Sequence, residues 1–127
     1  MKTFILLSSL VLLNVSADKC SDKKDTATDN KYKARLETKA LCMNYTFTLQ
    51  EGKLDTSFVN AVWTDESTGK TYKNAFGFAN PCDFPASIKE GDEFWFVIDS
   101  TGQKQCAVCM AYYPTPPKKI WMRVVTQ

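Results

Sequence analysis

From Ala34 onward the chain consists of short apolar and aromatic runs separated by turn residues. The turns recur about every ten positions, a spacing typical of all-β sandwiches and barrels. The alternation is clearest between Leu41 and Leu49, where every second residue is apolar or aromatic. A period of two predicts a strand with one buried and one solvent-facing side. The sequence therefore predicts an all-β fold, namely a small antiparallel β-sandwich of about six to seven strands, with a small barrel as the alternative.

Strands are predicted in 35–49 and in five later segments, which are 57–63, 71–78, 93–98, 105–113 and 118–125. Gly69, in the polar connection 64–70, suits the turn of a hairpin. The turn at 99–102 predicts a second hairpin, in which 105–113 pairs with 93–98. Segment 18–33 is polar and mixed in charge, so we expect a solvated N-terminal arm, followed by a single β-sandwich domain over 34–127.

Residues 1–17 have the three parts of a secretory signal peptide. Lys2 supplies a positive charge, an apolar region follows from Phe4 to Leu13, and Val15 to Ala17 form a small-residue cleavage site. This apolar run is too short to span a bilayer, and no second stretch of spanning length follows it. We therefore expect cleavage after Ala17 and a secreted, extracellular mature chain.

Secretion places the cysteines in an oxidising compartment, where they become candidates for disulfides that stabilise the domain. The mature chain has five, and these are Cys20, Cys42, Cys82, Cys106 and Cys109. An odd number allows at most two bridges within the chain, so one thiol is left over or links two chains into a dimer. The sequence alone does not choose the connectivity.

Cys106 and Cys109 have the C-x-x-C spacing of thiol oxidoreductases. Within a strand, however, positions three apart lie about 10 Å apart and face opposite sides. A disulfide requires Cα atoms within about 7 Å. We therefore expect the two cysteines to bridge to different partners, and an extracellular thiol/disulfide protein is kept only as an alternative.

Histidine is absent, which excludes Ser-His-Asp and Cys-His nucleophile systems and every metal site that needs imidazole. No cofactor or metal is expected. The remaining enzyme alternative is a small hydrolase that uses paired carboxylates from Asp65, Glu66, Asp92 and Glu93. Without the leader, 15 basic and 14 acidic residues remain, a net charge of +1. This balance argues against a nucleic-acid partner, whose binding needs a surplus of Lys and Arg.

Two further motifs bear on the surface of the protein. Asn44-Tyr45-Thr46 is an acceptor motif for N-linked sugar, and Asn44 lies on the solvent-facing side of its predicted strand. Pro114 to Pro117 is expected to form a stiff turn between strands, because proline lacks the amide that a ladder needs.

Aromatic side chains next to basic ones suggest where a partner would bind. Trp121 lies among Lys118, Lys119 and Arg123, so basic groups could surround an aromatic contact, and Trp95 is a second exposed candidate. The leading expectation is a secreted, non-catalytic protein that binds an extracellular protein or glycan, as effectors, toxins and inhibitors do. The surface expected to do so joins these residues to the Pro114 to Pro117 turn.

Overall fold

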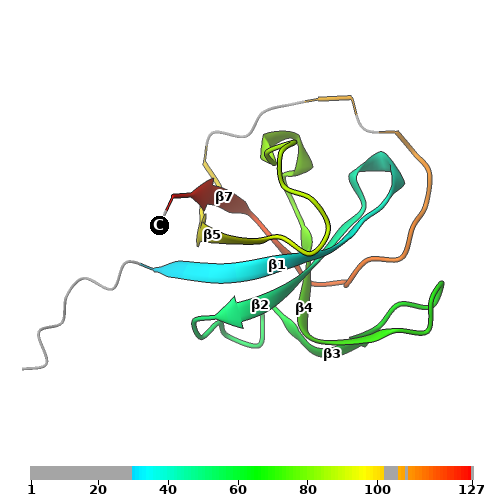
Figure 1. Ribbon diagram of the computed structural model, residues 1–127, viewed down its shortest axis with the longest axis horizontal. Helices are drawn as coiled ribbons and strands as arrows, with labels where there is room; N and C mark the ends of the chain where they lie inside the picture. Colours follow the sequence, from blue (N-terminus) through cyan, green and yellow to red (C-terminus); the bar gives the residue numbers. More distant parts are fainter. Residues whose placement is uncertain (1–29, 102–105, 108, 127) are drawn as a thin grey trace, which may run out of the picture.

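The computed structural model describes residues 30–101, 106–107 and 109–126 of the chain. It confirms the all-β fold (Figure 1). The elements in chain order are β1 (Lys31–Lys39), η1 (Leu41–Met43), β2 (Tyr45–Glu51), β3 (Asn60–Thr64), β4 (Thr71–Phe78), η2 (Pro81–Asp83), β5 (Glu93–Ile98), β6 (Lys119–Ile120) and β7 (Met122–Val125), where η marks a short 3-10 turn. Within the described ranges, no helix has the length and apolar character needed to cross a membrane.

The strands form one rolled sheet in the order β3-β4-β2-β1-β5-β7, and all neighbours along this path are antiparallel. β6 pairs with β4 in parallel over two residues, Lys119 with Gly77 and Ile120 with Phe78. Only Trp121 separates β6 from β7, so the C-terminal segment contacts both β4 and β5. The sheet is therefore rolled without closing along its length, consistent with a small disulfide-stabilised sandwich.

The core fills the inside of this roll, and Phe47 lies at its centre. The ring centroid of Phe47 is 5.4 to 5.7 Å from those of Phe76, Phe78, Phe84 and Phe94. Edge-on and offset contacts between rings add to the free energy gained by burying them. The other buried apolar residues of this cluster are Ala34, Leu36, Val59, Phe96, Ile120 and Met122.

The side chain of Asn80 extends the pairing of β4 with the C-terminal segment. The Ala79 amide donates to the Ile120 carbonyl oxygen (3.0 Å). One residue further, Asn80 Nδ2 donates to the Met122 carbonyl oxygen (2.9 Å), and the Met122 amide donates to Asn80 Oδ1 (2.9 Å). Both bonds are buried. A side-chain amide thus pairs both backbone groups of Met122 where the strand pairing itself has ended.

The sheet begins at Lys31, so it includes the last three residues of the segment expected to be a polar arm. Tyr32 explains this boundary, because its ring packs on the core 5.5 Å from the ring of Phe96. The alternation expected over 35–49 is interrupted between β1 and β2. There, Cys42 and Met43 adopt left-handed conformations (φ 59° and 58°), which reverse the chain. Leu41, expected on the buried face, is 78% exposed.

The prediction of a strand over 105–113 is wrong for the residues that the structure describes in this segment, because none of them forms a strand. β5 instead pairs with β1 and β7. The two cysteines explain the difference, because Cys106 is bonded to Cys82 in η2 and Cys109 to Cys42 in η1. The expectation that they bridge to different partners is confirmed, although the reason is their position in an irregular connection. The hairpin around Gly69 is present between β3 and β4.

Replacing Asn80 with Ala should lower the free energy of unfolding by about 2–4 kcal/mol, because two buried backbone groups of Met122 would lose their partners. Urea unfolding monitored by tryptophan fluorescence measures this difference. The matched control is Asn30→Ala, at an exposed position before β1, which should change stability by less than about 0.5 kcal/mol. Equal stability of the Asn80→Ala and wild-type proteins would contradict the role given to this side chain.

Candidate functional site

Residues 106–107 and 109–118, which belong to the connection between β5 and β6, pass over the end of the rolled sheet at which η1 and η2 lie (Figure 1). We call these residues the arch. They form neither strand nor helix. Two disulfides fix the arch, Cys82–Cys106 (Cα–Cα 5.7 Å) and Cys42–Cys109 (Cα–Cα 4.9 Å). Long connections without regular structure are usually functional or disordered, and these bridges restrain this one.

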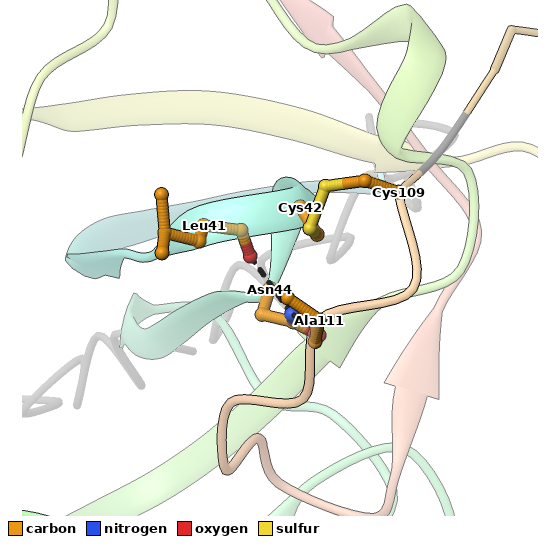
Figure 2. The surroundings of a disulfide bond; sticks show 5 residues. All are labelled: Leu41, Cys42, Asn44, Cys109 and Ala111. Carbon is orange, nitrogen blue, oxygen red and sulfur yellow. Dashed lines mark hydrogen bonds between the residues drawn. A yellow bond between two sulfur atoms is a disulfide. The ribbon is translucent and has the colours of Figure 1, made fainter.

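Asn44 holds the arch beside the Cys42–Cys109 bridge (Figure 2). Its Nδ2 atom donates to the carbonyl oxygen of Ala111 in the arch (3.0 Å) and to that of Leu41 (2.8 Å). Nδ2 is also the atom to which an N-linked sugar would be attached. The acceptor motif expected from the sequence therefore coincides with a contact that positions the arch.

The arch is also bonded to the loop of the β3–β4 hairpin. Tyr112 donates to Glu66 (2.8 Å), and this hydrogen bond raises the pKa of Tyr112. Tyr113 contacts both the buried carboxylate of Asp65 (3.4 Å) and the hydroxyl of Ser67 (3.1 Å). Burial on its own would raise the pKa of Asp65, but the hydrogen bonds from Ser67 and Tyr113 contribute to a net lowering. Asp65 is thus held as a carboxylate that orders this loop.

The other two carboxylates of the hydrolase alternative lie at the start of β5. Asp92 accepts a hydrogen bond from the Lys89 amide (2.9 Å). Glu93 bonds Arg35 (2.9 Å), and this bond and the nearby Lys33 lower the pKa of Glu93. A general acid at neutral pH needs a raised pKa. The lowered pKa values of Asp65 and Glu93 favour ion pairing and loop ordering for these two groups.

On the far side of the sheet from the core, β1, β5 and β7 present a face of paired side chains, which we call the outer face. Because Phe94 and Phe96 point into the core, Trp95 and Val97 point outward. Strand register puts Trp95 between Lys33 and Val125, and Val97 between Lys31 and Arg123. The Lys33 ammonium lies 5.6 Å from the centre of the Trp95 ring, a cation–π distance.

Ion pairs join the charged groups of the outer face. Lys33 lies 3.7 Å from Glu51 and 3.4 Å from Glu93, and Arg123 Nε bonds Asp99 at 2.9 Å. The pKa of Asp99 falls to about 2, because the Thr101 hydroxyl, Arg123 and the Thr101 amide all donate to its carboxylate. Lys33 and Arg123 on this face thus have acidic neighbours.

The structure brings some of the expected binding residues together. Trp95 and Arg123 share the outer face, on adjacent strands. Lys119 and Trp121 alternate with the buried Ile120 and Met122, so they point to the same side of the C-terminal segment as Arg123.

Lys118 does not join this surface. Its Nζ atom donates to the carbonyl oxygens of Thr56 and Val59, and its amide donates to Asn60 Oδ1 (3.2 Å), so it ties the arch to the β2–β3 connection. The turn of prolines is also less open than expected. Pro114 and Pro116 are buried, and a Cβ atom at Gly77 would lie 3.2 Å from the Pro116 carbonyl oxygen. Cys20 lies outside the described residues.

Sequence reasoning missed an apolar rim beside the Cys42–Cys109 bridge. Leu41 precedes one bridged cysteine and Met110 follows the other, and Met110 is 98% exposed. Tyr112, further along the arch, is 81% exposed. The alternating pattern placed Leu41 on the buried side, and Met110 in a strand. In the sequence, only the cysteines and the acceptor motif at Asn44 marked this region.

Comparison with protein-family models finds no matching family, and searches of curated proteins and of solved structures find no significant match. The functional argument therefore depends on the geometry of the molecule.

Removing the two bridges separately should cost different amounts of stability. The loops that they close span 67 residues for Cys42–Cys109 and 24 for Cys82–Cys106. Loop-closure entropy predicts losses of about 4 and about 3 kcal/mol, respectively. Urea unfolding of the two paired Cys→Ser variants under non-reducing conditions measures both values. A larger loss for the shorter loop would contradict the entropic explanation.

The Asp99 carboxylate should make stability depend on pH in the acid range. Its pKa is lower in the folded chain (about 2) than its ordinary 3.8. Its contribution to folding is therefore complete above pH 3.8 and is lost as the pH falls through about 2. The stability difference between wild type and Asp99→Asn, measured by urea unfolding, should shrink over this interval. Thr101→Val, which removes the first of the donors, should give an intermediate profile, and a constant difference between wild type and Asp99→Asn would be inconsistent with this assignment.

Proposed function

We propose that this chain is a secreted, non-catalytic binding protein whose outer face recognises an extracellular protein. The supporting observation is the placement of Trp95 between Lys33 and Val125, with Val97 and Arg123 beside it in the next row. Aromatic and arginine side chains are enriched at the energetic centres of protein interfaces. The two disulfides within the chain fit the oxidising environment of a secreted protein.

The charges of the outer face favour a protein over an acidic glycan. A site for sulfated or uronic sugars needs basic groups that lack acidic neighbours. Here Lys33, Arg35 and Arg123 have Glu51, Glu93 and Asp99 as partners. A protein surface of mixed charge can exchange such pairs across an interface, where complementarity provides specificity.

The outer face is also built on paired backbone. It is formed by three hydrogen-bonded strands, and the Asp99–Arg123 pair fixes one of its charged side chains. The outer face would then lose less side-chain and backbone entropy on binding a partner than a flexible loop would. This preorganisation is the physical basis on which a small scaffold could bind tightly.

A disulfide-linked dimer remains the second candidate. The two bridges use four of the five cysteines of the mature chain, which leaves Cys20 as the odd one. In an oxidising compartment an odd cysteine is suited to a bond between chains. Such a dimer would present two copies of the outer face.

Binding is tested by probing an array of extracellular protein domains, and in parallel an array of neutral and sulfated glycans, with the purified labelled protein. Protein partners found in this way are then titrated against Trp95→Ala and Arg123→Glu. We expect Trp95→Ala to weaken binding about thirtyfold, the ~2 kcal/mol of an interface hot spot. The matched control is Trp63→Ala, because Trp63 lies on β3 and stacks on Tyr72 at 6.0 Å.

Thermal unfolding first establishes that each variant is folded. Protein binding that Trp63→Ala leaves intact and that both outer-face variants weaken would support the proposal. Equal affinity of wild type and the outer-face variants would overturn the assignment of the surface. Binding confined to sulfated glycans would overturn the choice of a protein partner.

A further inference from the structure

Thr46 places a hydroxyl group in the buried part of β2. Thr46 lies in β2 and is 1% exposed, and its Oγ1 atom finds no hydrogen-bond partner among the residues that the structure describes. Thr48 lies two positions further along, on the same side of the strand. Its hydroxyl has a partner, because it donates to Glu37 at 2.7 Å. Leaving a buried hydroxyl without a partner is unfavourable, and valine has nearly the same shape. Hydrogen bonding among the described residues therefore gives no reason for threonine rather than valine at position 46.

The acceptor motif does give such a reason. Asn44-Tyr45-Thr46 needs the hydroxyl of its third residue, and Asn44 is in a half-exposed turn. Both hydrogen bonds of Asn44 Nδ2 are exposed to solvent (Figure 2). If one N–H were replaced by a sugar, the other could still donate to Ala111, and the Leu41 carbonyl would keep the Asn44 backbone amide as a donor (3.3 Å).

We propose that Asn44 carries an N-linked glycan, which is attached before β2 packs into the sheet and before the Cys42–Cys109 bridge forms. Burial of Thr46 places attachment before the packing of β2, because a transferase can reach its hydroxyl only in the unfolded segment. The bridge follows in this order, because it fixes the turn that holds Asn44 beside the start of β2. The donor is an oligosaccharide bound to a lipid diphosphate. Asn44 Nδ2 attacks the anomeric carbon, the bond from this carbon to the diphosphate oxygen breaks, the lipid diphosphate leaves with the electron pair, and Nδ2 loses one proton.

The glycan would lie beside the apolar rim formed by Leu41 and Met110. These exposed side chains flank the bridge next to Asn44, so the sugar would shield them from other molecules. It would also lie at the far end of β1 from the outer face. Lys33, which pairs with Trp95, and Lys39, which pairs with Tyr45, are six positions apart in β1, about 20 Å. The glycan is therefore compatible with the proposed binding surface but does not depend on it.

The experiment expresses the full chain through the secretory pathway of a eukaryotic cell. Wild type and Thr48→Val should be secreted with one glycan, which peptide N-glycosidase removes while converting Asn44 to aspartate. Thr46→Val should be secreted without it. In wild type digested by trypsin without reduction, the glycan should be found on a disulfide-linked set of the peptides 40–53, 74–89 and 105–118.

A second measurement separates the motif from the fold. In unglycosylated protein produced in an oxidising bacterial compartment, Thr46→Val should unfold at the same or a higher temperature than wild type. Thr48→Val should unfold at a temperature about 4–8 °C lower, because it loses the bond to Glu37. An unmodified wild-type Asn44, absence of the glycan from chains in which Cys42 and Cys109 are both replaced with Ser, or marked destabilisation by Thr46→Val would each overturn the proposal.

Discussion

The packing of rings around Phe47 is the constraint on which the rest of the structure depends. Phe76, Phe78 and Phe94 come from β4 and β5, which lie on opposite sides of β1 and β2 in the sheet. They can converge on one ring only if the sheet rolls around it. A domain of this size buries a modest area, so every side of the roll has to be covered. The C-terminal segment provides that cover by pairing with β5 through β7 and with β4 through β6.

Rolling the sheet leaves two places where backbone pairing alone is insufficient. Beyond β6, Asn80 takes over and pairs both backbone groups of Met122. At the end of the roll, η1 and η2 reverse the chain, and the two disulfides connect these turns to the arch. The left-handed backbone of Cys42 and Met43 is unfavourable by itself, and the bridge and the Asn44 contacts keep it in place.

The sequence predicts features that depend on near neighbours and misses those that depend on distant ones. Alternation from Tyr45 to Leu49 correctly indicates β2, and Gly69 indicates the hairpin of β3 and β4. The same alternation fails at Leu41, because the turn that exposes this side chain is stabilised by a bridge to a residue 67 positions from Cys42. Lys118 lies apart from the outer face for a similar reason. Its partners, Thr56 and Val59, belong to a connection that only the parallel β4–β6 pairing brings near.

The aromatic and basic residues proposed for binding show the same division. Proximity in sequence suggested Trp121 with its basic neighbours, whereas strand register assembles Trp95 with Lys33, Val125 and, in the next row, Arg123. The proposed surface also combines an aromatic ring with basic groups, but its members come from β1, β5 and β7. Because β-strands place successive side chains on opposite faces, the aromatic core and the outer face are built from alternate residues of the same segments. Packing of Phe94 and Phe96 in the core therefore holds Trp95 outward. The packing of the core thus determines which side chains the outer face presents.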